Sequence, residues 1–169
     1  GRPARKFVLK RSMVDDVEHS KWTTLEQLVV ERSGTSRKSG EERIANLEPL
    51  REHFIIPDLA RTGGWPAAKH SLLFPIEETW KPLEDVFVEY MQHWKGMRSE
   101  EVSARTFAVE LILALAAALL VLWSFGVAHR DIHDGNIVAR LVDGVLEIRI
   151  IDLESMAEYC GEGPLWAIG

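Results

Sequence analysis

The sequence predicts a mixed α+β fold, and three features of the chain support this prediction. Residues 5–11 are a short run of apolar residues with basic flanks, which is typical of a strand. Residues 102–125 are almost entirely apolar over a length that only a helix reaches. Residues 137–140 and 146–151 are two strand candidates, and the Asp143-Gly144 pair between them favours a hairpin turn.

The first third of the chain is predicted to hold two helices. Thr23 or Thr24 is expected to cap a helix that runs through Glu31, because the apolar residues that follow have helical spacing. Residues 33–40 are small, polar and basic, as in a surface loop. Residues 41–54 then predict a second helix, although it contains a proline.

The remaining elements follow the same logic. Residues 71–76 predict a short buried strand. Residues 83–94 predict a helix, since Val86 and Tyr90 fall on one side of it. Residues 154–169 are rich in glycine and are expected to be irregular.

Residues 111–128 form an apolar run without a charged residue, near the lower length limit for a membrane span. Arg105 and Glu110 precede the run, and the polar sequence His129-Arg130-Asp131 follows it at once. This setting favours a buried helix that leads into a functional loop, so we expect no membrane partner.

Composition narrows the function further. The 169 residues carry a net charge of −6, which gives no reason to expect a nucleic-acid partner. The chain has one cysteine, so it has no internal disulfide framework. That fits a reducing compartment, and we expect a cytoplasmic protein.

The most informative stretch is HRDIHDGN at residues 129–136, followed by IIDLE at residues 150–154. Asp131, Asn136 and Asp152 have the order that a phosphoryl-transfer site needs. One carboxylate, Asp131, orients and accepts the proton of the attacking hydroxyl. The amide oxygen of Asn136 and the carboxylate of Asp152 are suited to hold magnesium against the phosphates.

These segments resemble the catalytic and magnesium loops of the protein-kinase-like superfamily, which read H-R-D-L-x-x-x-N and D-F-G. The sequence SLLFPIEETWKPLEDV at residues 71–86 looks like the fifth strand and hinge of fungal protein-kinase-like domains. The resemblance covers most of the chain and is strongest from residue 105 to residue 154. It implies a two-lobed kinase fold, with ATP and magnesium as cofactors and a protein Ser/Thr hydroxyl as the favoured acceptor.

The resemblance also assigns the lobes and the nucleotide contacts. Residues 1–76 would be a partial N-lobe, and residues 77–169 the hinge and a partial C-lobe. Lys10 would reach the α- and β-phosphates, and Ile76 would contact the nucleotide at the hinge. The glutamate partner of Lys10 is left open among Glu31, Glu41 and Glu42, with Glu42 favoured.

Two further residues of the loop receive supporting roles from the resemblance. His129 would pack beneath the aspartate loop. Arg130 would meet a phosphorylated activation segment, with an ordinary surface ion pair as the alternative.

Two departures from the kinase pattern keep other functions open. Position 133 is histidine where protein kinases have lysine, which resembles the H-x-D-x-H-x-x-N loop of aminoglycoside and choline kinases. Asp152-Leu153-Glu154 replaces D-F-G, and D-x-E is common in small-molecule kinases. A small-molecule kinase is therefore the first alternative.

The expected kinase domain is also incomplete. No G-x-G-x-x-G loop precedes the Lys10 strand, and only a short segment follows Asp152, so we expect a truncated fold. The apolar helix at residues 111–123 would then lack cover, and an exposed face of that kind marks an interface. An inactive pseudokinase or interaction module, self-associating through this helix, is the second alternative.

Overall fold

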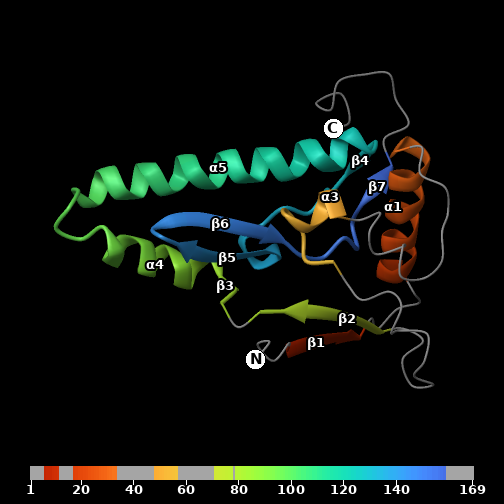
Figure 1. Cartoon of the computed structure of the whole chain (residues 1–169), viewed down its shortest axis with the longest axis horizontal. Helices are drawn as coiled ribbons and strands as arrows, with labels where there is room; N and C mark the ends of the chain where they lie inside the picture. Colours follow the sequence, from red (N-terminus) through yellow and green to blue (C-terminus); the bar gives the residue numbers. More distant parts are fainter. Residues whose placement is uncertain (1–5, 12–16, 34–47, 57–70, 78, 159–169) are drawn as a thin grey trace.

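The computed structural model describes residues 6–11, 17–33, 48–56, 71–77 and 79–158 (Figure 1). These residues form a mixed α and β structure with three small antiparallel sheets, which confirms the predicted α+β class. The elements, in chain order, are β1 (Lys6–Arg11), α1 (Val17–Ser33), α3 (Glu48–Arg51), β2 (Ser71–Ile76), β3 (Lys81–Pro82), α4 (Leu83–His93), α5 (Glu100–Ser124), β4 (Val127–Ala128), β5 (Ile137–Val142), β6 (Val145–Ile150) and β7 (Ala157–Glu158).

The predicted hairpin is present as β5 and β6, which pair from Ile137–Ile150 to Val142–Val145. Asp143 and Gly144 form its turn with φ values of 52° and 79°. A two-residue hairpin turn needs positive φ at both central positions, which aspartate tolerates and glycine adopts freely. The Asp-Gly signal therefore located this turn correctly.

Replacing Gly144 by alanine is expected to lower the free energy of unfolding by about 2 kcal/mol. A left-handed φ costs an ordinary L-residue about 1–2 kcal/mol, and the added Cβ would also lie 2.5 Å from Nε2 of His93. Gly96→Ala is the matched control, because Gly96 has φ +83° but no atom within 4 Å of its Cβ position. Denaturant unfolding of both variants checks this. Equal losses would show that His93 moves aside without cost.

Two N-terminal helices differ from the prediction. Helix α1 begins at Val17, so Thr23 and Thr24 lie inside it rather than at its cap. The fully buried Trp22 lies three positions before Leu25 on the same face, and packing of this ring extends the helix by more than a turn. The helix predicted at residues 41–54 is α3, which ends at Arg51, and residues 34–47 lie outside the described residues.

Long-range pairing overrides two local expectations. Phe54, predicted as helical, forms a parallel bridge to Ile150, and the N–H of Ile55 donates to the Ile150 carbonyl at 3.1 Å. Ala157 and Glu158, predicted as irregular, form β7 against β4. In both segments the backbone groups find their partners in a distant strand, which local sequence patterns do not report. The loop predicted at residues 33–40 falls almost wholly outside the described residues.

The described core has two apolar clusters. One joins α1, the C-terminal half of α5 and the segment after β6, with Trp22, Leu122 and Leu153 fully buried. The other lies between α4, the N-terminal half of α5 and the β5–β6 hairpin. Ile132, in the middle of the HRDIHDGN segment, packs against both clusters. This residue fixes the segment at the junction of the two clusters.

Helix α5 forms one edge of the molecule, and the hairpin lies between it and the β1–β2 pair (Figure 1). Its inner face is covered, but Ile112 and Leu113 on its outer face are 63% and 65% exposed. The expectation of a helix buried on all sides is therefore wrong for the described residues, and the expectation of an uncovered face is confirmed. By length and composition α5 is also able to cross a membrane, with 17% of its most apolar window buried.

Candidate functional site

The end of α5 directs the chain into the candidate site. Helix α5 ends at Ser124, and the buried Gly126 follows with φ 72°, a conformation that favours glycine. The chain then forms β4, which is held by its pairing with β7, and continues directly into His129. The loop therefore begins from a fixed point rather than from a free helix end.

Asp131 and Asn136 are bonded to each other across this loop. Nδ2 of Asn136 donates to the Asp131 carbonyl at 3.0 Å and lies 3.4 Å from Oδ2 of Asp131. A carbonyl only accepts hydrogen bonds, so this contact fixes which end of the amide faces Asp131. Oδ1 of Asn136 is consequently the end of the amide that faces away from the Asp131 carbonyl.

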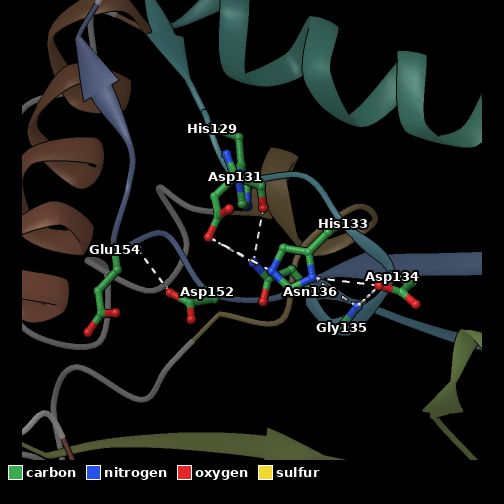
Figure 2. Close-up of polar contacts among 8 residues, drawn as sticks. All are labelled: His129, Asp131, His133, Asp134, Gly135, Asn136, Asp152 and Glu154. Carbon is green, nitrogen blue, oxygen red and sulfur yellow. Dashed lines mark hydrogen bonds and ion pairs between the residues drawn. The ribbon is translucent and has the colours of Figure 1, made fainter.

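Asp152 joins the pair through the backbone. The N–H of Ile151 donates to the Asn136 carbonyl at 2.9 Å, which fastens the end of β6 to the loop. Oδ1 of Asp152 accepts from the N–H of Glu154 at 3.0 Å, and this turn holds the carboxylate in place. Figure 2 shows the Asp131 and Asn136 side chains meeting, with the Asp152 side chain to one side of them and joined to Glu154.

The backbone is strained at two positions of the site. Arg130 and Asp152 have φ values of 70° and 67°, and Asp143 in the hairpin turn is the only other described non-glycine residue with positive φ. Such conformations cost roughly 1–3 kcal/mol each and persist only where surrounding contacts enforce them. One strained residue directly precedes Asp131, and the other is Asp152 itself. Strain at these two places favours a functional constraint over an ordinary loop.

His129 supports the loop from below. Its side chain is 2% exposed, and Nδ1 accepts from the N–H of Asp131 at 3.3 Å. Nε2 is buried without a hydrogen bond of ordinary geometry to the described residues. Burial lowers the pKa of His129 below its usual value, while the Ile151 backbone and the carboxylates of Asp131 and Asp152 act in the opposite direction. His129 is therefore a neutral positioning residue.

The low pKa of His129 predicts that stability falls on acidification between pH 7 and pH 5. The unfolded chain protonates this ring near pH 6.5, whereas the folded chain resists protonation, so the unfolded state binds more protons below that pH. Denaturant unfolding at several pH values is expected to show a smaller slope for His129→Gln than for the natural chain. His93→Gln, at an exposed histidine, is the control for the loss of an imidazole. An unchanged slope in His129→Gln would contradict the assignment.

His133 lies beside the hydrogen-bonded pair of Asp131 and Asn136. The N–H of Gly135 donates to Nδ1 of His133 at 3.1 Å and to Oδ1 of Asp134 at 3.0 Å. Because Nδ1 accepts, the proton of the neutral ring is on Nε2, which lies 3.9 Å from Oδ2 of Asp131. The imidazole is half exposed and therefore open to a ligand at the mouth of the site.

The other sequence-predicted residues are not brought to this cluster by any described contact. Arg130 is exposed and has no ion pair among the described residues. Lys10 lies in β1 opposite Leu72, and Ile76 ends β2 opposite Lys6. Glu42 lies outside the described residues.

The sequence analysis missed the residues that hold the predicted hinge. Trp80 is buried with the guanidinium groups of Arg140 and Arg149 at 4.5 and 4.6 Å from its ring centroid. Arg140 also pairs with Glu77 at 3.0 Å. These contacts fasten Glu77 and Trp80 to the hairpin. The signal available in the sequence was the presence of one arginine, Arg140 or Arg149, in each of the two strands that were predicted to pair.

The donor set fits magnesium better than a transition metal. Within the described residues no three His, Cys, Asp or Glu side chains come together as a metal cluster. Asp152 and Oδ1 of Asn136 are hard oxygen donors, and magnesium is commonly held by one or two carboxylates with phosphate and water as its other ligands. These donor types are therefore of the kind that magnesium prefers.

We compared the chain with known proteins at three levels. It matches no protein-family model, no curated protein and no solved structure.

Proposed function

We propose that this chain carries the catalytic and magnesium-binding part of a kinase-like phosphotransferase that uses ATP and Mg²⁺. The observation that supports it best is the joining of Asp131, Asn136 and Asp152 through the Asn136 amide and carbonyl. The strained backbone at Arg130 and Asp152 supports it independently.

Each residue then has a definite task. Asp131 orients the acceptor hydroxyl and takes up its proton, since its carboxylate is half exposed at the mouth of the site. The amide oxygen of Asn136 and the carboxylate of Asp152 would hold the magnesium ion. Magnesium, when bound, neutralises the charge that develops on the transferred phosphate. His129 fixes the loop that carries Asp131.

The arrangement of the sheets supports a two-lobed reading. The β1–β2 pair is a sheet of its own, separate from the β3–β5–β6 sheet of the hairpin. We assign β1 and β2 to a small lobe that ends near residue 76, and the helices and hairpin to a large lobe. Lys10 and Glu42 in the small lobe, with Ile76 at the hinge, complete the nucleotide site in this proposal.

Two classes of hydroxyl are candidates for the phosphate acceptor, and the histidine at position 133 is the reason to test both. A protein Ser/Thr hydroxyl is the leading acceptor because His129-Arg130-Asp131 is intact. A small-molecule hydroxyl is the alternative acceptor, because His133, with Nε2 beside Asp131, stands where protein kinases have lysine and small-molecule kinases have histidine. A panel of sugars, choline, aminoglycosides and generic protein substrates separates the two classes.

Calorimetric titration of the full chain with ATP, with and without magnesium, tests the proposal. Binding that depends on magnesium, followed by transfer of the γ-phosphate to an acceptor, is the expected result. Binding without transfer to any acceptor would favour the pseudokinase alternative. A folded sample that binds no nucleotide under either condition would overturn the proposal.

A further inference from the structure

The outer face of α5 is a continuous apolar stripe. Its large members are Val109, Ile112, Leu113, Leu119, Leu120 and Trp123, which are 36–65% exposed. The exposed Ala116 lies at the centre of the stripe, and we call these seven residues the outer seam. The opposite face of the same helix, at Phe107, Ala118 and Leu122, is buried in the two core clusters.

The spacing of the outer seam is that of a helix-packing surface. Val109, Ala116 and Trp123 recur every seven residues, with an apolar pair between each two of them. This heptad spacing is what a helix uses to pack lengthwise against a second helix. Scattered surface residues would not keep this register over two heptads.

The outer seam is also complementary to itself in reverse. Its spacing reads the same in both directions from Ala116, so an antiparallel copy places Val109 opposite Trp123 and Ile112 opposite Leu120. The smallest side chain then lies at the two-fold axis, where the helices approach most closely, and a small residue faces a large one at each end. A two-fold contact requires this kind of self-complementary surface.

The exposed area is of the size that a dimer needs. From the exposed fractions, the outer seam presents on the order of 600 Å² of apolar surface, at the top of the range for monomeric proteins. Two such faces together approach the roughly 1,200 Å² of the smallest stable protein interfaces.

A membrane span is the competing occupant, and the inner contacts of α5 oppose it. Glu110, at the start of the apolar run, accepts from the N–H of Leu146 at 3.2 Å and from the Tyr90 hydroxyl at 3.2 Å. These bonds tie α5 to the hairpin and to α4. The hairpin carries the Arg140–Glu147 ion pair, so a span would draw charged groups into the lipid or break the fold.

We infer that two copies of this chain dimerise through the outer seam, with their α5 helices antiparallel and Ala116 at the two-fold axis. This inference is independent of the proposed phosphotransfer, because it rests on the outer face of α5 and uses no residue of the site loop. It predicts a single dimer interface in which Val109 of one copy lies opposite Trp123 of the other.

Sedimentation equilibrium of the full chain tests the dimer. The natural chain is expected to be a dimer at micromolar concentration, and Leu120→Glu is expected to weaken dimerisation at least about 30-fold, as loss of a central apolar contact does. Val88→Glu, at an exposed valine on α4, is the matched control and leaves the dimer intact. Circular dichroism shows that both variants are folded. A monomeric natural chain, or one that instead binds phosphatidylcholine vesicles as a monomer, overturns the inference.

Cysteine cross-linking tests the register separately. In a Cys160→Ser background, a chain with Val109→Cys is mixed with a chain with Trp123→Cys. The antiparallel register predicts that disulfides form between the two different chains and that neither chain cross-links to itself. Cross-linking of each chain to its own copy would show a parallel contact and overturn the proposed geometry.

Discussion

Asp152→Asn is expected to weaken ATP binding in the presence of magnesium on the order of 100-fold. The change removes the one negative charge that we assign to the metal, and losing a charge-assisted contact costs roughly 1.5–3 kcal/mol. The fold should be unaffected, because asparagine tolerates the φ of 67° and its amide oxygen still accepts from the N–H of Glu154. Calorimetric titration with ATP and magnesium measures the loss.

Asp143→Asn is a closely matched control for this change. Asp143 is also an aspartate with positive φ, and it loses the same charge, but it lies in the hairpin turn. We expect it to bind magnesium and ATP as the natural chain does. An equal loss in both variants would mean that only net charge matters. Normal binding by Asp152→Asn would remove Asp152 from the metal site.

Asp131→Asn is expected to lower the rate of phosphate transfer about 10²–10⁴-fold while ATP affinity changes only a few-fold. A positioned carboxylate that takes up a proton contributes an effect of this size. Asparagine keeps the shape of the side chain, and Asn136 remains bonded to the carbonyl of residue 131. The variant therefore loses the proton acceptor and keeps the geometry. Single-turnover transfer of labelled γ-phosphate measures the rate apart from binding.

Asp134→Asn is the control for the second prediction. Its carboxylate lies three positions along the same loop, is 88% exposed and contacts only the loop residues Gly135 and His133. We expect transfer within about threefold of the natural chain, since surface carboxylates contribute little. A transfer rate in Asp131→Asn close to that of Asp134→Asn would exclude Asp131 as the proton acceptor.

Some of the structure was predictable because its signals are local. The β5–β6 hairpin follows from an Asp-Gly pair, which sets the backbone of the turn by itself. Helices α4 and α5 follow from apolar spacing, and their observed bounds differ from the prediction by only one or two residues. The contact between Asp131 and Asn136 was also accessible, because the two residues lie five positions apart in one loop.

The errors occur where distant contacts decide the outcome. The start of α1 depends on where the Trp22 ring finds a core, and the role of Phe54 depends on the edge of β6. Neither partner is near in the sequence. The contacts of Trp80 with the guanidinium groups of Arg140 and Arg149 were missed for the same reason, since they join the predicted hinge to both strands of the hairpin.

The sequence by itself determined the mixed α and β class, the order of the main elements and the choice of Asp131, Asn136 and Asp152 as candidate site residues. Only the tertiary structure decided that the Asn136 amide turns its oxygen away from Asp131 and that Arg130 and Asp152 are held in strained conformations. The tertiary structure also decided which side of α5 is covered. The sequence of a helix that is apolar all round does not show which face packs against the core. Local patterns choose a backbone conformation, whereas the cover of a helix arises from contacts between segments far apart in the chain.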